Sequence, residues 1–199
     1  SSIFNYDDQK FDFNTTWDIV NNAIKNELFP GAQILVVKDA EILAEKSFGK
    51  QTFNPASYNI NSDSIYDVAS LTKVLATTPV IMKLIKKKLL HLNHKVSQFY
   101  PEFKGKWKDE VTIKHLLTHS SGLKAYEQYY LNTSVNNYND IIKDITTKQK
   151  LSAKPGSKFI YSDLGMILLM DIAQIVTGRK FENLVQSWIL NPINMKNTY

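Results

Sequence analysis

A hydroxyl and an amine stand three positions apart in the stretch DVASLTKVLATT, residues 67–78, as Ser70 and Lys73. Residues three apart share one face of a helix, so Lys73 can reach the Ser70 hydroxyl if a helix begins at or just before Ser70. A serine becomes a nucleophile when a base takes its proton, and a lysine partly desolvated near a helix N-terminus has a lowered proton affinity. The spacing fits a nucleophile with its base, but a helix cap beside a solvated lysine fits the same residues.

The segment that follows Ser70 has the apolar period of a buried helix. It extends to residue 90, and Pro79 is expected to kink it or to start a second segment. The helix dipole at its N-terminal end favours a developing alkoxide on Ser70. The positions expected to be buried are Leu71, Val74, Leu75, Ile81, Leu84, Ile85 and Leu89.

Residues 1–64 predict a helix followed by a β-hairpin. An amphipathic helix capped by Thr15 or Thr16 is expected first. Two β-branched runs then flank a short polar turn at 38–40, which predicts the hairpin, and an aperiodic Asn- and Ser-rich loop follows. Because a two-stranded hairpin is marginally stable alone, the sheet needs more strands than residues 1–199 supply.

Residues 65–199 predict a mainly helical lobe. The stretch VTIKHLLTHSSGL indicates a short helix capped by Thr112 and terminated by Gly122. The stretch YSDLGMILLMDIAQIVTGRK indicates a long apolar helix closed by Gly178, and FENLVQSWIL adds another helix. The expected fold class is α+β, with an antiparallel sheet flanked by helices and a mainly helical lobe.

Composition excludes several classes of function. The chain has 199 residues, of which 43% are hydrophobic, so it can bury a sizeable core. A net charge of +5 is modest and indicates solubility rather than nucleic-acid binding. The absence of cysteine excludes a thiolate nucleophile and cysteine-ligated metals. No apolar run approaches the roughly 18 residues of a membrane span, so we expect no stable membrane insertion. Because the net charge is modest, we expect no nucleic-acid partner.

Two further patterns resemble a zinc site and a basic surface for an anionic membrane or nucleic acid, but a simpler explanation fits each of them. His115 and His119 have the spacing of a zinc pair on one helix face, but no Glu lies between them and no third ligand is evident. We expect them to pack and form hydrogen bonds, and we expect no metal and no cofactor. The basic stretch KLIKKKLLHLNHK, residues 83–95, is best explained by lysines on the outer face of a core helix.

Six stretches occur in the order seen in serine β-lactamases and penicillin-binding proteins, and the chain resembles that family from Phe29 to Tyr199. The similarity is greatest to the branch of class C β-lactamases, D-alanyl-D-alanine carboxypeptidases and β-lactamase-like esterases. It implies a β-lactamase/transpeptidase-like fold. The stretches are FPGAQILVVKDAEILAEKSFG, YDVASLTKVLAT, LLHLNHKVSQFYPEF, VTIKHLLTHSSGL, KPGSKFIYSDLGMILL and LNPINMKNTY.

The resemblance implies roles for four residues. Ser70 matches the acylated nucleophile of the family, and Lys73 matches its proton-accepting partner. In YSD, which matches the family's Tyr-x-Asn motif, Tyr161 joins the proton relay and Asp163 takes the substrate-binding position of the Asn. An ionised Asp163 cannot donate to a substrate carbonyl, and it keeps Lys73 protonated, which shifts proton abstraction toward Tyr161. This departure is compatible with ester or amide hydrolysis and argues against efficient β-lactam turnover.

The family's third motif, Lys-Thr-Gly or His-x-Gly on a strand, is not found in the sequence. The resemblance places it after Tyr199, together with the remaining strands of the sheet. We therefore expect residues 1–199 to be the N-terminal portion of one β-lactamase-like domain, with 1–64 as its helix and hairpin and 65–199 as its mainly helical lobe. An isolated chain of this extent is expected to have an incomplete site and little activity.

The predicted function is that of a serine hydrolase that acts through an acyl-enzyme. Small esters, D-alanyl peptides and β-lactams are the expected substrates, in that order. The alternative is a non-catalytic, β-lactamase-like binding or accessory module, because a fold does not guarantee chemistry. The resemblance implies a bacterial protein of the periplasm or cell surface, with possible fusion to another domain in the full-length protein.

Overall fold

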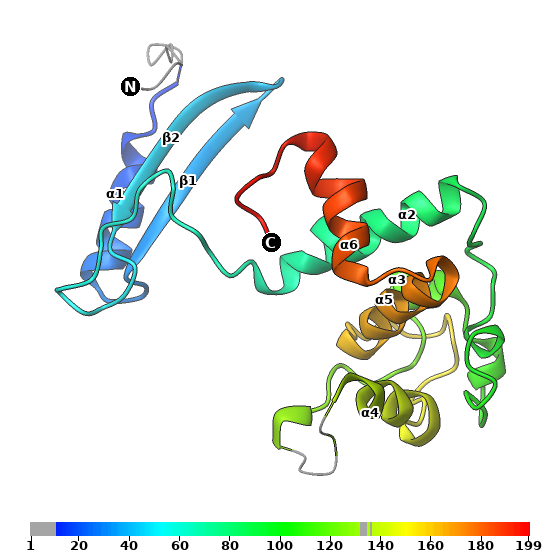
Figure 1. The fold of residues 1–199 in the computed structure, drawn as a ribbon. Coiled ribbons are helices and arrows are strands. Elements are labelled where there is room, and N and C mark those ends of the chain that lie inside the picture. Colours follow the sequence, from blue (N-terminus) through cyan, green and yellow to red (C-terminus); the bar gives the residue numbers. More distant parts are fainter. Residues whose placement is uncertain (1–10, 132–134, 136) are drawn as a thin grey trace. The chain divides into compact units, whose positions relative to one another are not determined.

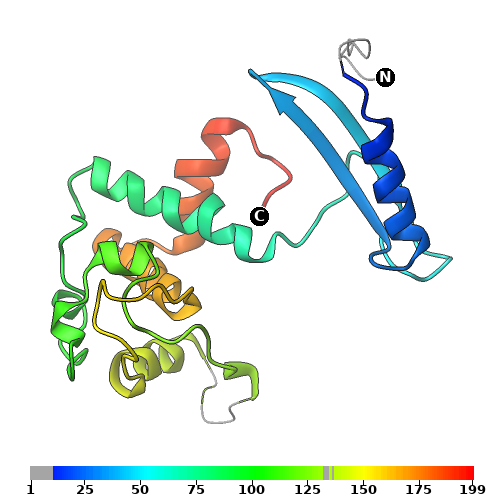
Figure 2. The same cartoon turned by 180° about the vertical axis from the view of Figure 1, so that it is seen from behind.

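The structure is a computed structural model that describes residues 11–131, 135 and 137–199. The chain divides into two compact units, Ser1–Asp67 and Val68–Tyr199. Figures 1 and 2 show the elements of each unit from opposite sides. The two units are described separately below.

The first unit is a helix beside a β-hairpin. Helix α1 (Asn14–Lys25) runs alongside strands β1 (Gly31–Lys38) and β2 (Glu41–Gly49) in both views (Figures 1 and 2). The strands are antiparallel and are joined by Asp39 and Ala40. Both turn residues have positive φ, 51° and 65°, which matches the twist of the strands.

The predicted cap of the first helix is wrong. Phe13 occupies the N-cap position, and the Asp12 Oδ1 atom accepts a hydrogen bond from the Asn14 N–H at 2.8 Å. The helix therefore begins at Asn14, before Thr15 and Thr16. The Asp12 carboxylate supplies the acceptor for a free N–H group that one of these threonines was expected to supply. The hairpin itself lies where the sequence predicted it.

The second unit opens with the segment that contains Ser70. A 3-10 turn (Ala69–Leu71) and a π-helical turn (Lys73–Thr77) lead into helix α2 (Thr78–Lys86). Pro79 lies in the first turn of α2, where its missing N–H costs no hydrogen bond, so the prediction of a new segment at Pro79 is confirmed.

The burial predicted for this segment is only partly correct. Ile81 and Leu84 are fully buried, and Ile85 is half-buried against the core. The segment contacts the core of its unit along one side only, so the other predicted positions remain exposed in the described part of the chain. The exposed positions are Leu71, Val74, Leu75 and Leu89.

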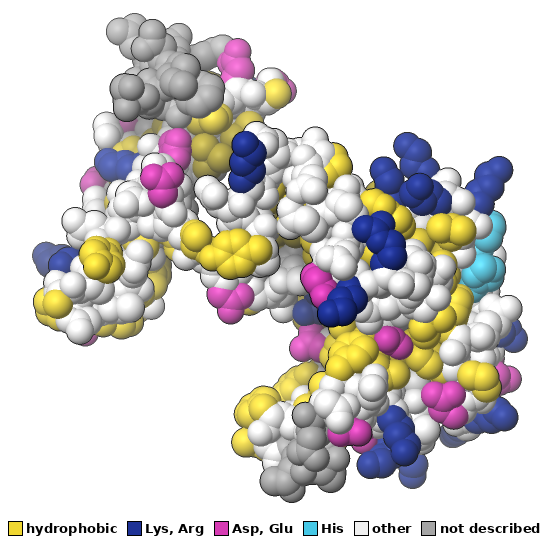
Figure 3. All heavy atoms as spheres, in the orientation of Figure 1, with side chains coloured by type: hydrophobic (Ala, Val, Ile, Leu, Met, Phe, Trp, Pro, Cys, Tyr) yellow, Lys and Arg dark blue, Asp and Glu magenta, His cyan; other side chains and the backbone are white. Residues whose placement is uncertain are grey.

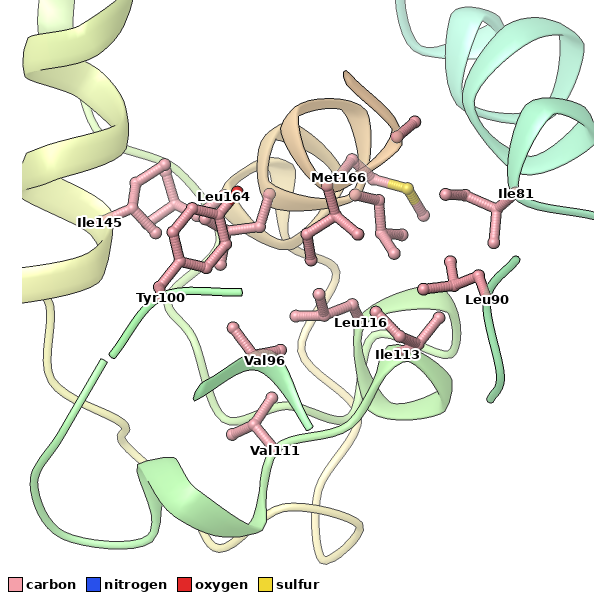
Figure 4. Close-up of a cluster of buried hydrophobic side chains, with 14 of the residues drawn as sticks. Ile81, Leu90, Val96, Tyr100, Val111, Ile113, Leu116, Ile145, Leu164 and Met166 are labelled. Carbon is pink, nitrogen blue, oxygen red and sulfur yellow. The ribbon is translucent and has the colours of Figure 1, made fainter. Parts of the chain in front are cut away.

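The core of the second unit is built around helix α5 (Asp163–Thr177). Helices α2, α3 (Ile113–Leu117), α4 (Tyr138–Lys143) and α6 (Phe181–Val185) all contact it. Figure 4 shows side chains from several of these elements meeting at α5. Helix α5 ends at Gly178, whose φ of +66° closes the helix as predicted. A rigid core therefore supports the N-terminal end of α5, where Asp163 lies.

Hydrogen bonds to one carboxylate also fix α5. The Tyr100 hydroxyl donates to Asp171 at 2.6 Å, and the Tyr138 hydroxyl donates to it at 2.8 Å. Burial and the contact with Asp171 raise the pKa of both tyrosines, so they remain donors at ordinary pH. Asp171 thereby connects α5 to α4 and to the segment before α3.

Exposed lysines lie at the end of helix α2. Lys86, Lys87 and Lys88 are exposed, and basic side chains project from the end of α2 (Figure 3). Within the described ranges, no helix combines the length and the apolar character that crossing a membrane requires.

Helix α3 begins as predicted but ends earlier. The Thr112 Oγ1 atom accepts from the His115 N–H at 3.3 Å, which confirms Thr112 as the cap. The last helical residue is Leu117, so Gly122 is not the terminator. Gly122 instead brings its own loop against residues 152–153, because its carbonyl accepts from the Ser152 N–H at 2.8 Å.

We expect Gly122→Ala to destabilise the protein by about 3 kcal/mol. Gly122 has a φ of +83°, and a Cβ atom there would lie 2.1 Å from the Ala153 carbonyl oxygen. Gly178→Ala is the matched control: its φ is +66° but nothing lies within 4 Å of the added Cβ, so it should cost only about 1 kcal/mol. Urea unfolding measures both, and equal costs would contradict the close approach at Gly122.

Candidate active site

Ser70 lies on the surface of the second unit, at the start of the helical segment. Its side chain is exposed, and it is the central residue of the 3-10 turn. Ala69, directly before it, has a φ of +44°, a left-handed conformation that residues with a Cβ seldom adopt. Strain of this kind gathers at functional sites because the surrounding structure must hold it in place.

Lys73 lies between Ser70 and Asp163. Its Nζ atom donates to the Ser70 Oγ atom at 3.0 Å and forms an ion pair with the Asp163 Oδ1 atom at 2.8 Å. Only 14% of the Lys73 side chain is exposed, against 48% for Asp163. The amine is thus held beside the hydroxyl by a carboxylate from a distant part of the sequence.

Tyr161 completes the cluster. Its phenol lies close enough to Ser70 and Lys73 for both side chains to lower its pKa. The Lys73 Nζ atom also lies 5.0 Å from the centre of the Tyr161 ring. The four residues that the sequence singled out, Ser70, Lys73, Tyr161 and Asp163, therefore meet at one place on the second unit.

The segment that carries Tyr161 and Asp163 is anchored through Ser162. The Ser162 hydroxyl donates to the Lys124 carbonyl at 2.7 Å and accepts from the Gly165 N–H at 3.2 Å, so it caps α5. The Asp163 N–H donates to the Ala125 carbonyl at 2.7 Å. Because Ser162 points into the protein, its two neighbours are directed toward Lys73.

The electrostatics of the cluster favour a protonated lysine. Burial alone would lower the pKa of Lys73, but its hydrogen bonds to Asp163 and Tyr161 and their charges together raise that pKa above its ordinary value. The hydrogen bonds from Ser70 and Lys73 lower the pKa of Tyr161. At neutral pH the cluster therefore holds a lysine cation beside a phenol that loses its proton more readily than usual.

His119 is a residue that sequence reasoning did not place in this cluster. Its ring centre lies 4.5 Å from that of Tyr161, and its Nδ1 atom accepts from the Ser162 N–H at 3.0 Å. His115, by contrast, interacts with Thr112 through Nδ1 at 3.1 Å. In the sequence, the spacing between His115 and His119 suggested only a possible metal pair. No short-range pattern connects His119 to Tyr161, which follows it by 42 positions.

No group of three or more His, Asp or Glu side chains gathers as a metal site among the residues that the structure describes. The candidate active site is instead an arrangement of a hydroxyl, an ammonium, a phenol and a carboxylate. Such a set can transfer a proton from the hydroxyl and so generate an oxygen nucleophile.

The chain is similar in sequence to known proteins. Residues 18–199 match the family model described as Beta-lactamase. The N-acetylmuramyl-L-alanine amidase of Bacillus subtilis is 30% identical over 186 residues, which cover 85% of this chain and 42% of the amidase. The chain thus spans less than half the length of this curated relative.

Solved structures share the fold. An octameric penicillin-binding protein homologue from Pyrococcus abyssi has a TM-score of 0.82 and 26% identity, over 94% of this chain and 44% of that chain. A class C beta-lactamase in complex with cefoxitin has a TM-score of 0.80 and 22% identity, over 94% of this chain and 50% of that chain. These likenesses confirm the β-lactamase/transpeptidase-like fold predicted from the sequence.

Proposed function

The chain belongs to the beta-lactamase family, and on that basis we propose that it is the N-terminal portion of a serine hydrolase that forms an acyl-enzyme on Ser70. The observation that carries the proposal is the meeting of the Lys73 amine and the Tyr161 phenol at the Ser70 hydroxyl. If Ser70 were only a helix cap and Lys73 only a solvated lysine, a third group from a distant segment would not be expected at the Ser70 oxygen.

Tyr161 is the proposed base. When its phenol is ionised, the Ser70 hydroxyl gives its proton to the phenolate as Oγ attacks the acyl carbonyl. Tyr161 then passes that proton to the leaving oxygen or nitrogen as the bond to the acyl carbon breaks. In the second half, a water gives a proton to Tyr161 and attacks the acyl carbon. The bond from that carbon to Ser70 Oγ then breaks, Tyr161 passes the proton to Oγ, and the acid is released.

Lys73 is proposed to stay protonated throughout. Its ammonium donates to Ser70 and favours the ionised form of Tyr161, and Asp163 balances its charge. The Ser70 backbone N–H, at the start of the helical segment, is the proposed first donor to the oxyanion.

The proposed substrates are small esters first, then D-alanyl peptides and then β-lactams. Asp163 supports this order, because its carboxylate already pairs with Lys73 and offers no donor to a substrate carbonyl. Esters have the better leaving group and depend least on that missing donor.

The proposed catalytic domain extends beyond Tyr199. Among residues 11–67, the described part of the first unit, the sheet has two strands, fewer than an independently stable sheet needs. The chain also covers about half or less of the proteins compared above. The missing strands and the third motif are expected in the continuation. Residues 1–199 alone should hydrolyse a chromogenic ester at least about 100-fold more slowly than the full-length gene product. Equal rates would contradict the proposed extent.

The proposed location is the periplasm or the cell surface. In support, the Bacillus subtilis relative is named for an amide bond of N-acetylmuramyl-L-alanine. Protease treatment of intact cells, with a cytosolic enzyme as the protected control, tests this location.

A substrate panel tests the proposed function. The full-length gene product is assayed with a p-nitrophenyl ester, a D-alanyl-D-alanine peptide and a chromogenic cephalosporin, beside Ser70→Ala. Hydrolysis that disappears in Ser70→Ala supports the hydrolase. Hydrolysis that is absent from the native protein, or that persists in Ser70→Ala, favours the non-catalytic module.

We expect Asp163→Asn to raise the acylation rate with the cephalosporin about 10-fold relative to the ester. The amide keeps an acceptor for Lys73 and adds a donor for the substrate carbonyl. Loss of the carboxylate also removes a cause of the raised pKa of Lys73. Stopped-flow acylation measures the ratio, and the exposed Asp109→Asn serves as the control. An unchanged ratio would show that Asp163 does not set the substrate preference.

A further inference from the structure

His119 holds the backbone on both sides of Tyr161. Its carbonyl oxygen accepts from the Ile160 N–H at 2.8 Å, and its Nδ1 atom accepts from the Ser162 N–H at 3.0 Å. Its ring also packs on Tyr161 itself, at 4.5 Å between ring centres, and on the edge of Phe159 at 5.9 Å. One residue thus fixes the position of the phenol that contacts Ser70.

The backbone of His119 directs its ring to this place. Helix α3 ends at Leu117, and His119 then adopts a φ of +53° while its N–H donates to the Leu116 carbonyl at 3.2 Å. A left-handed conformation is uncommon outside glycine, and asparagine, aspartate and histidine are the other residues that adopt it most often. Asparagine is also the residue whose side-chain oxygen replaces Nδ1 as an acceptor.

The hydrogen bond to Ser162 requires a neutral ring. Because Nδ1 accepts, the ring proton must lie on Nε2. Lys73, Tyr161 and Asp163 are the titratable groups that face the ring. Burial and the charge of Lys73 lower the pKa of His119, and Asp163 offsets this only in part. The ring therefore stays neutral down to a lower pH than that of an ordinary histidine.

We propose that neutral His119 is a positioning residue for Tyr161, and that protonation of its ring disables the site. Protonation turns Nδ1 into a donor that faces the Ser162 N–H, so the hydrogen bond is lost and a second cation appears beside Lys73. The segment that carries Tyr161 then loses one of its two hydrogen bonds to His119. This inference rests on the proposed function, because the disabled step is proton transfer from Ser70.

Two variants of the full-length gene product test the inference by activity. His119→Asn keeps an acceptor for Ser162 and does not titrate, so its kcat/KM for the ester should stay within about 3-fold of the native value at neutral pH. Both proteins should lose activity as Tyr161 becomes protonated, but toward about pH 5 the native protein should lose at least about 10-fold more activity than His119→Asn. His119→Ala lacks the acceptor and should lose kcat about 100-fold at every pH, with KM little changed.

The control is His115→Asn, because His115 is the other partly buried histidine of this segment and its Nδ1 atom also accepts from a backbone N–H, that of Thr112 at 3.2 Å. This control should keep the native acid limb. An acid loss that is as large in His119→Asn as in the native protein, or one that is reduced in His115→Asn, would overturn the role of His119. Thermal unfolding of each variant identifies a loss of activity that is only a loss of folding.

An NMR titration separates this inference from the proposed function. With ¹³C-labelled tyrosine, the lowered pKa of Tyr161 should persist in His119→Asn and return toward its ordinary value in His119→Ala. This readout needs no substrate. If Tyr161 titrates alike in all three proteins, His119 does not position it, whether or not the native protein hydrolyses esters. If Tyr161 responds as expected but no ester is hydrolysed, the proposed function fails and the positioning stands.

Discussion

Lys73→Met lowers the rate of Ser70 acylation by about 1,000-fold in our account. Methionine keeps most of the length of the side chain but removes the ammonium that donates to the Ser70 oxygen at 3.0 Å. The change also removes a hydrogen bond and a charge that lower the pKa of Tyr161. The remaining phenol is then ionised less often at neutral pH, so two contributions to the rate are lost together.

The measurement for this variant is the burst phase of a chromogenic ester, followed by stopped flow. Lys154→Met is the matched control, because Lys154 forms an exposed ion pair with Glu110 at 3.4 Å and lies outside the cluster. The control should keep the native burst rate. If Lys73→Met changes the burst rate by less than about 3-fold, the ammonium has no part in acylation and the proposed mechanism is wrong.

Tyr161→Phe should lower the acylation rate by about 100-fold to 1,000-fold. Phenylalanine keeps the ring that packs on His119 at 4.5 Å, so the segment should remain in place while the proton acceptor is lost. The pH dependence gives a second signature. The pKa of Tyr161 is lowered, so the ionised base forms as the pH rises through a value below that of an ordinary tyrosine, and the native rate should rise over that range. The variant should lack this rise.

The pH–rate profile of acylation measures both signatures of Tyr161→Phe. Tyr126→Phe is the control, because Tyr126 is 61% exposed and belongs to the loop before α4. It should leave the rate and the profile unchanged. If the acylation rate of Tyr161→Phe still rose with pH as in the native protein, Tyr161 would not be the base and Lys73 would take that role.

Local patterns in the sequence were sufficient for part of the site. The spacing of Ser70 and Lys73 predicts that both side chains share one face, and the structure brings them to 3.0 Å. Pro79, Thr112 and Gly178 also mark the element boundaries that their chemistry predicts. In each of these cases the deciding interaction lies within a few residues of the chain.

Long-range contacts could not be read in the same way. Tyr161 and Asp163 were placed beside Lys73 through a family resemblance, because no local pattern connects residues about ninety positions apart. His119 was considered only as a metal ligand, since its contact with Tyr161 depends on the left-handed backbone after α3. The burial of Leu71 and Val74 was overestimated because an apolar period does not say which faces have a partner.

The most direct test of the central claim is to locate a covalent adduct by mass spectrometry. The full-length gene product is treated with a fluorophosphonate, digested and sequenced, beside Ser70→Ala and the control variant Ser97→Ala, whose serine is half-buried and lies outside the cluster. We predict a single modified peptide with the label on Ser70, retained in Ser97→Ala and absent from Ser70→Ala. A native protein that takes no label, or takes it on another serine, would contradict the claim that Ser70 is the nucleophile.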